Sequence, residues 1–244
     1  MPLRVDAALS PAEPLPAGFA AAIVVDVIRA TTTAAYFLQA GAGRLLLAGE
    51  VETARRLAGG GALLAGERGG VPLEGFDLGN SPREAAALDL AGREVVMTTT
   101  NGTVAALRSA AVSPQVALGS LANASAVARW AVGFDSVLFV AAGREGRVAL
   151  DDTYAIGVVI EKLMGLAEVE LSDSARLALE ASRADAAEVL AASAAARALE
   201  PVGLAADVGV CARRDALRVV PVMKGRLEGA LTFEGALTFE GAVF

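Results

Sequence analysis

The stretch Ala20-Ala-Ala-Ile-Val-Val-Asp-Val-Ile28 decides the fold class of this protein. A run of small and branched apolar residues with one charged side chain near its end is typical of a strand buried on both faces, as in a parallel sheet covered by helices. The next segment, Thr31 to Ala40, has the apolar spacing of a helix that packs on such a sheet. A buried strand that leads directly into a helix is the repeating unit of α/β proteins.

The same alternation of short apolar runs and alanine-rich segments continues along the chain. The predicted strands are Ala20–Ile28, Arg44–Gly49, Gly61–Glu67, Arg93–Thr98, Gln115–Gly119, Asp135–Ala142 and Leu217–Met223. The predicted helices are Thr31–Ala40, Val51–Gly59, Gly102–Ala111, Ala122–Val132 and Asp151–Gly165. We therefore predict an α/β fold of three layers, α/β/α, around a largely parallel or mixed sheet, built as one unit or in two lobes.

The C-terminal third departs from this alternation. Ser172 to Glu200 is rich in Ala, Glu, Arg and Ser, which predicts two consecutive helices that cover a sheet face or form a contact between subunits. The sequence Gly-Ala-Leu-Thr-Phe-Glu then occurs twice, at Gly229–Glu234 and Gly235–Glu240. Two copies are too few for a solenoid, and their alternating pattern suits an edge hairpin or an extension. We divide the chain into one α/β domain, residues 1–228, and a repeat tail, residues 229–244.

Composition excludes several chemistries. The 244 residues contain no histidine and one cysteine, Cys211, which excludes a Ser-His-Asp triad, a cysteine–histidine zinc site and an intrachain disulfide. Any metal must therefore bind oxygen ligands, which favours Mg²⁺, Ca²⁺ or Mn²⁺ over Zn²⁺. With 28 acidic and 21 basic residues the formal net charge is -7, which argues against a nucleic-acid-binding surface but not against small anions held by a few arginines.

The mean hydropathy of +0.52 makes a membrane protein an alternative to test. The longest stretch without a charged residue, Ser109 to Ala128, contains proline, glutamine and asparagine, which disfavour a membrane-spanning helix. Asp6 and Glu13 interrupt any signal-peptide pattern. We expect a soluble cytoplasmic protein with no membrane or nucleic-acid partner, and its apolar composition and helical C-terminal third favour a homo-oligomer such as a dimer.

Polar residues follow five of the predicted strands at their carboxyl ends, where open α/β sheets bind ligands. They are Asp26, Arg29 and Thr31–Thr33; Glu67–Gly70; Thr98–Thr103; Ser120 and Asn123; and Arg144–Arg147 followed by Asp151 and Asp152. Helix starts, hydroxyls and guanidinium groups bind phosphate, and carboxylates beside them suit Mg²⁺. No Walker motif occurs and no G-x-G-x-x-G follows a strand, so the pattern predicts a small phosphorylated ligand without motif support for a nucleotide.

Some of these residues also have a purely structural interpretation. Asp151 and Asp152 stand where an N-cap and a first-turn acid of a helix are expected. Asp77 can cap the turn at Gly79–Ser81. Asp26 is harder to explain in this way, because an unpaired carboxylate is costly to bury at the end of an apolar strand.

The ordered motifs resemble the 2-phosphosulfolactate phosphatase (ComB) family. The resemblance extends from about Ala20 to Gly157 and returns at Pro221–Lys224. Its segments are Val25-Asp-Val-Ile-Arg-Ala-Thr-Thr-Thr33, Gly66-Glu-Arg-Gly-Gly70, Glu74-Gly-Phe-Asp-Leu-Gly-Asn-Ser-Pro82, Thr98-Thr-Thr-Asn-Gly-Thr103, Gly119-Ser-Leu-Ala-Asn-Ala-Ser125 and Ala141-Ala-Gly-Arg144.

The resemblance implies a Mg²⁺-dependent phosphatase that converts 2-phospho-3-sulfolactate to sulfolactate and inorganic phosphate, a step of coenzyme M biosynthesis. In bacteria that do not make coenzyme M, a similar small anionic phosphomonoester is the implied substrate. This chain departs from the family pattern at Asp151-Asp152, where Glu-Asp is usual, and in its hexapeptide tail.

We assign roles to the candidate residues as follows. The predicted catalytic residues are Asp26, which either attacks phosphorus or positions the attacking water, Asp152 and Arg68. The predicted substrate-binding residues are Arg29, Arg68, Thr99, Asn101, Gly102, Ser120, Asn123, Arg144 and Arg147. The predicted Mg²⁺ ligands are a subset of Asp26, Glu67, Asp77, Asp151 and Asp152.

Two other functions compete with this one. A non-catalytic sensor or binding protein for a phosphorylated metabolite would need the same arginines and helix starts, but it would gain nothing from carboxylates beside an anion. An aspartate-nucleophile phosphatase of the haloacid dehalogenase type is a minor alternative, because Ile28 stands where its motif has a second aspartate.

Overall fold

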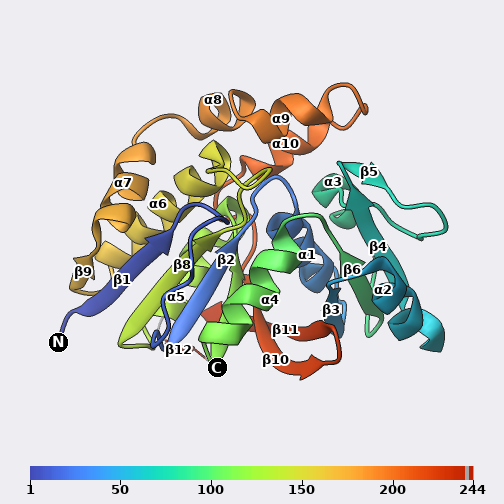
Figure 1. The fold of residues 1–244 in the computed structure, drawn as a ribbon, viewed down its shortest axis with the longest axis horizontal. Coiled ribbons are helices and arrows are strands. Elements are labelled where there is room, and N and C mark those ends of the chain that lie inside the picture. The colour runs from blue at the N-terminus through green and yellow to red at the C-terminus, as the bar shows by residue number, and fades with distance from the viewer. Residues whose placement is uncertain (240–241, 244) are drawn as a thin grey trace.

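The computed structural model describes residues 1–239 and 242–243, which form a mixed sheet with helices on both faces (Figure 1). The strands are β1 (Leu3–Ala8), β2 (Ala21–Val25), β3 (Arg44–Ala48), β4 (Leu63–Arg68), β5 (Val71–Pro72), β6 (Glu94–Thr98), β7 (Gln115–Gly119), β8 (Ser136–Ala141), β9 (Val169–Leu171), β10 (Val219–Leu227), β11 (Ala230–Phe239) and β12 (Ala242–Val243). The helices are α1 (Ala30–Gln39), α2 (Val51–Leu57), α3 (Pro82–Ala85), α4 (Gly102–Val112), α5 (Ala124–Ala131), α6 (Leu150–Met164), α7 (Asp173–Ala181), α8 (Ala186–Ala191), α9 (Ala194–Leu199) and α10 (Ala206–Cys211). The α/β class and the mixed sheet are as predicted.

The sequence of β2 is a continuous apolar run because the strand is buried on both faces. All five of its side chains are buried, and they alternate between two cores. Ala21, Ile23 and Val25 face the core shared with α5, α6 and α7, whereas Ala22 and Val24 face the core shared with α1 and α4. The predicted three-layer arrangement follows from this alternation.

The sheet has two parallel parts joined by an antiparallel hairpin. Its strand order is β5-β4-β6-β3-β11-β10-β7-β2-β8-β1-β9, with β12 beside β11. The parts β7-β2-β8-β1-β9 and β3-β6-β4 are each parallel, and β10 and β11 are antiparallel to their neighbours. This pairing makes β2 and β6 run in opposite directions, so a flat sheet would place their carboxyl ends at opposite edges.

Twist brings those ends together. Neighbouring strands rotate by roughly 20–25°, which accumulates to roughly 100° or more over the steps from β2 to β6. In Figure 1, β2 and β4 both rise toward the side where α8, α9 and α10 lie, and the hairpin β10–β11 lies below them. The carboxyl ends of the two parallel parts therefore face one common region.

The repeat tail is not at an edge. Residues 230–233 of β11 pair with β3, Leu231 opposite Leu47, and residues 230–237 pair with β10 on the other side. The expected edge position is therefore wrong for the first copy, because residues 230–233 lie between β10 and β3 inside the sheet. Glu240, the last residue of the second copy, lies outside the described residues.

The two copies of the hexapeptide supply a matched test of this position. Leu231 is 2% exposed, whereas its counterpart Leu237 is 50% exposed. We expect Leu231→Ala to lower the free energy of unfolding by about 2 to 3 kcal/mol, since it leaves a cavity between β3 and α-helical side chains. Leu237→Ala should change it by less than about 0.5 kcal/mol. Equal losses in urea unfolding would contradict this placement.

The segment from residue 172 to 200, all of which is described, holds three helices rather than the expected two. α7 packs against α6 and β1 and so covers part of a sheet face, as predicted. α8 and α9 lie over the carboxyl ends of the strands instead (Figure 1). The strands β1, β5 and β9 and the helices α3 and α10 have no counterpart in the prediction. β5, β9, α3 and α10 have six residues or fewer, and in β1 the charged Arg4 and Asp6 interrupt the apolar run.

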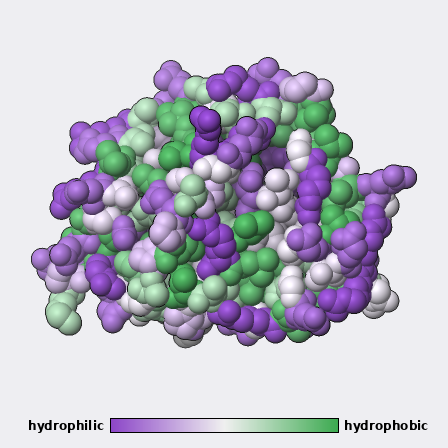
Figure 2. Space-filling model, in the orientation of Figure 1, coloured by the Kyte–Doolittle hydropathy of each residue, from purple (hydrophilic) through white to green (hydrophobic). Residues whose placement is uncertain are grey.

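Within residues 1–239 and 242–243, no helix combines the length and apolarity that a membrane crossing requires. Hydrophilic and hydrophobic residues are interspersed on the face drawn in Figure 2. The high mean hydropathy reflects the many buried alanine, valine and leucine side chains of the two cores.

Candidate active site

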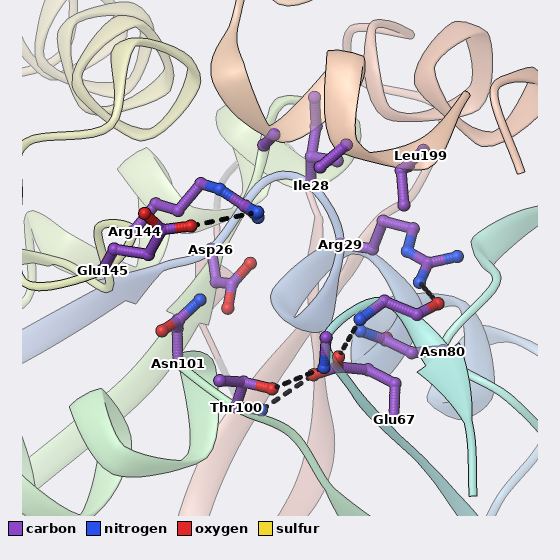
Figure 3. A pocket seen from close by; sticks show the side chains of 14 residues that line it. Asp26, Ile28, Arg29, Glu67, Asn80, Thr100, Asn101, Arg144, Glu145 and Leu199 are labelled. Carbon is purple, nitrogen blue, oxygen red and sulfur yellow. Dashed lines mark hydrogen bonds and ion pairs between the residues drawn. The ribbon is translucent and has the colours of Figure 1, made fainter. Parts of the chain in front are cut away.

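A cavity of about 260 Å³ lies at the common carboxyl ends of the strands, beneath α9 (Figure 3). Its polar walls come from the residues that follow β2, β4, β6 and β8, and its apolar roof comes from α9. The lining residues are Asp26, Ile28, Arg29, Glu67, Gly69, Gly70, Asn80, Thr100, Asn101, Arg144, Glu145, Ala195, Ala198 and Leu199. A narrow extension adds Gly143, Ala149, Asp151 and Asp152. Four of the five strand-end clusters predicted from the sequence therefore contribute residues to this cavity.

Asp26 stands at the centre of this cavity. It is the first residue after β2 and is 7% exposed. Its Oδ1 accepts a hydrogen bond of 3.3 Å from the Ala30 N–H at the start of α1, and the Gly102 N–H at the start of α4 also faces the carboxylate. A Cβ on Gly102 would lie 2.8 Å from Asp26 Oδ2, so glycine allows this approach. Two helix starts therefore hold one carboxyl group in the cavity.

Asp151 and Asp152 lie in the first turn of α6 and are 2% and 3% exposed. The N-cap of α6 is Ala149, so neither aspartate caps the helix with its side chain. Asp152 accepts hydrogen bonds of 2.9 Å from Val27 N–H and from Gly143 N–H. Asp152 therefore connects the loop after β2 to the loop after β8. This structural role adds to the metal-binding or acid–base role predicted from the sequence.

Burial raises the pKa values of all three aspartates, and the charges of neighbouring carboxylates add to the effect at Asp26 and Asp152. Burial raises the pKa of Asp26 to about 7, with further increases from the charges of Asp151 and Glu67 and a decrease from the Ala30 N–H. Burial likewise raises the pKa of Asp151 to about 6, against the lowering effect of nearby backbone N–H groups and Arg144. Burial, then the charges of Asp151 and Asp26, raises the pKa of Asp152. A cation or a bound proton would relieve this repulsion.

Glu67 is a second carboxylate that ties loops together. Its Oε2 accepts a hydrogen bond of 2.6 Å from Gly70 N–H, and its Oε1 accepts one of 2.7 Å from Thr100 N–H. Both oxygens are therefore engaged at the ends of β4 and β6. Glu67 and Asp152 are thus committed to contacts between loops, which leaves Asp26 and Asp151 as the better placed cation ligands.

The donor set fits Mg²⁺ better than a metal that needs a protein cage. Among the described residues, no group of three or more histidine, cysteine, aspartate or glutamate side chains is arranged around a metal position. Mg²⁺ commonly uses one or two carboxylates together with phosphate oxygens and water. Asp26 and Asp151, which line the extension together and lie close enough for the charge of Asp151 to act on Asp26, match that requirement.

Two arginines oppose these carboxylates. Arg144 follows β8, its side chain is 37% exposed, and its nearest acidic partner is Glu145 at 3.4 Å. Arg29 is buried and bonded at 2.8 Å to Asp207 and at 2.9 Å to the Gly70 carbonyl. Figure 3 shows Arg144 and Arg29 on opposite sides of Asp26. The charge of Arg144 is therefore more available to a bound anion than that of Arg29, which Asp207 of α10 holds in place.

Other predicted site residues lie outside the cavity lining. Arg68 points to Thr98 Oγ1 at 3.0 Å and to the Glu67 carbonyl at 2.8 Å. Arg147 is exposed, and its main chain closes a turn with Arg144. Exposed Asp77 accepts a hydrogen bond of 2.8 Å from Leu64 N–H, which joins its loop to β4.

Three polar residues that seemed suited to anion binding serve strand-to-helix turns instead. Thr99 exchanges hydrogen bonds of 3.1 Å with Thr103 at the start of α4. Ser120 and Asn123 form a capping box, and Asn123 Nδ2 also donates to the Leu118 and Val219 carbonyls. Because these groups are satisfied internally, the cluster after β7 does not reach the cavity.

Sequence reasoning missed several lining residues. Asn80 and Thr100 line the cavity, although the sequence analysis assigned them no role. Ser81 and Asp207 do not line it, but Ser81 Oγ donates a hydrogen bond of 2.6 Å to Asp207 and so holds the loop of Asn80. The alanines and leucine of α9 carry no chemical signal in the sequence. Only their position over the strand ends reveals them.

The chain is similar to proteins of one family. The family model described as 2-phosphosulpholactate phosphatase matches residues 9–226. A Thermus thermophilus protein named "Probable 2-phosphosulfolactate phosphatase" is 51% identical over 215 residues, covering 86% of this chain and 91% of its own. Proteins of the same name from Deinococcus radiodurans, 47% identical over 83% of this chain and 87% of their own, and from Thermotoga maritima, 31% identical over 90% and 95%, are also similar. Residues 9–226 contain every residue that lines the cavity and its extension, and this chain belongs to the 2-phosphosulfolactate phosphatase family.

Proposed function

We propose that this protein is a Mg²⁺-dependent phosphatase that hydrolyses 2-phosphosulfolactate, or a similar small anionic phosphomonoester, to the hydroxy acid and inorganic phosphate. The observation that carries the proposal is a single cavity in which three buried aspartates face an available arginine. Family membership and the names of the similar proteins support the substrate.

The charges that line the cavity support the need for a cation. Of the described residues in the cavity and its extension, two are arginines and five are carboxylates: Arg29 and Arg144 against Asp26, Glu67, Glu145, Asp151 and Asp152. An ester with phosphate, carboxylate and sulfonate groups would be repelled by this excess. Mg²⁺ bound by Asp26 and Asp151 would neutralise part of the charge and polarise the phosphoryl oxygens.

The chain's own groups divide the remaining work. Arg144 is placed to donate hydrogen bonds to phosphoryl oxygens, where negative charge must be stabilised during the transfer. Asn101, beside Asp26 in Figure 3, offers an amide to the same group. Asp26, held at the cavity by two helix starts, takes the proton of an attacking water or attacks phosphorus itself. The roof formed by Ala195, Ala198 and Leu199 limits access of bulk water.

The assay measures inorganic phosphate released from 2-phosphosulfolactate by the purified full-length chain. We expect release with Mg²⁺, loss of release to background after chelation, and recovery when Mg²⁺ is added back, because the carboxylates alone repel the substrate. Calorimetry should show Mg²⁺ binding to the wild-type protein. Binding of the ester without turnover would favour the sensor function, and full activity after chelation would exclude the metal requirement.

Other expectations from the sequence remain proposals. They are a cytoplasmic location, a homo-oligomer such as a dimer, the lack of nucleic-acid and membrane partners, and a place in coenzyme M biosynthesis where the source makes that coenzyme.

A further inference from the structure

Asn80 is a buried cavity residue that the proposed reaction does not yet use. It is 5% exposed and lines the cavity in the loop before α3. Its main chain is held on both sides: its carbonyl accepts a hydrogen bond of 3.3 Å from Thr33, and the next residue, Ser81, caps α3 and donates to Asp207 at 2.6 Å. The loop therefore presents the Asn80 side chain in a defined place.

The Asn80 carboxamide is unsatisfied. Its Oδ1 is buried and has no hydrogen-bond partner among the described residues. Asn123 shows the contrast, because its Oδ1 accepts from Ser120 and its Nδ2 donates to two carbonyls. A buried amide oxygen without a partner is costly and needs a hydrogen-bond donor such as a bound water, whereas the N–H groups of the same amide can bind an anion. Thus the Asn80 amide is not needed to hold its own loop.

The position of Asn80 indicates which end of a substrate it meets. Figure 3 shows Asn80 beside Arg29 and Glu67, on the side of the cavity opposite Arg144. The extension with Asp151 and Asp152 adjoins Arg144. If the phosphoryl group lies between Arg144 and the aspartates, as the proposed function has it, the remainder of the molecule extends toward Asn80.

Resting on that proposed function, we propose that Asn80 is a specificity-determining residue that hydrogen-bonds the anionic group at the non-transferred end of the substrate, a carboxylate or sulfonate. The contact with the anion is made by the two N–H donors on Nδ2, and no bond to Oδ1 fixes the amide against the rotation that turns these donors toward it. Arg29 contributes less than its charge suggests, because Asp207 and the Gly70 carbonyl already engage it.

The test compares two esters that differ in one group. Phosphoglycolate carries a carboxylate on the ester carbon, and ethyl phosphate carries a methyl group there. Asn80→Asp keeps the side-chain shape but replaces donors by a repelling carboxylate. We expect it to raise KM for phosphoglycolate and 2-phosphosulfolactate by about 30-fold or more, with kcat within about threefold, and to leave kcat/KM for ethyl phosphate within about threefold.

Gln115→Glu serves as the matched control, since it makes the same change of charge at an exposed position at the other end of β7. Asn80→Ser, which removes the amide without adding charge, should show the same selective loss at smaller size. An equal effect of Asn80→Asp on both esters, or no effect on either, would overturn the proposal. If the wild-type protein released phosphate from none of the three esters, the proposed function would fail first, and the assignment of Asn80 would fail with it.

Discussion

Replacing Asp26 by asparagine is expected to lower kcat by at least about a hundredfold, the scale of a lost general base. Asp26 is the carboxyl group on which two helix starts converge, and asparagine keeps its shape but neither accepts a proton nor binds Mg²⁺ as strongly. Phosphate release at saturating Mg²⁺ and 2-phosphosulfolactate measures this. Asp89→Asn, at an exposed position before β6 and away from the cavity lining, is the control and should keep wild-type turnover. Near-normal kcat for Asp26→Asn would remove Asp26 from the mechanism.

The same variant should be more stable than the wild type when Mg²⁺ is absent. Because the folded pKa of Asp26 is raised to about 7 from an ordinary 3.8, the folded protein holds a proton that the unfolded chain has lost between these values. Stability from this group is therefore present below about pH 4 and declines as the pH rises through about 7. At pH 8 in chelator, Asp26→Asn should raise Tm by about 3 to 8 °C. A lower Tm would show that the carboxylate is a structural requirement.

Asp207→Ala is expected to lower the free energy of unfolding by about 3 to 5 kcal/mol, the effect of leaving a buried charge without its partner. The side chains of Arg29 and Asp207 are 2% and 1% exposed, and their contact of 2.8 Å joins α10 to the loop after β2. The change also removes the acceptor of Ser81 Oγ, which holds the loop of Asn80. Urea unfolding measures the loss, and kcat/KM should fall with it because Arg29 lines the cavity.

Glu180→Ala is the comparison for Asp207→Ala, since it removes the partner of Arg183 in a pair that is exposed on both sides. It should change the free energy of unfolding by less than about 1 kcal/mol, as water already solvates both charges. Asp207→Asn keeps the Ser81 contact and serves if the alanine variant does not fold. A loss below about 1 kcal/mol for both Asp207 variants would show that Arg29 finds another partner.

Much of the site could be predicted because charged and polar residue types at the ends of apolar strands are themselves evidence of a binding site. A carboxylate at the end of a fully apolar strand is unusual, and Asp26 was chosen on that ground. Arg29, Glu67, Asn101, Arg144 and the two aspartates of α6 were chosen as polar groups at strand ends, and all of them lie in the cavity or its extension. Residues whose polar atoms serve local turns look the same in sequence, which is why Ser120 and Asn123 could not be separated from them.

The sequence by itself determined the α/β class, the buried strands and the polar groups at their ends, because side-chain period and residue type are local properties. Only the tertiary structure decided which of those ends meet, since that depends on the twist accumulated between β2 and β6 and on α9 lying above them. The hexapeptide repeat makes the distinction concrete. Leu231 and Leu237 occupy the same place in identical local sequences, yet one is 2% and the other 50% exposed. Their difference arises from the strand that pairs with the first copy, β3, which no local pattern within the repeat encodes.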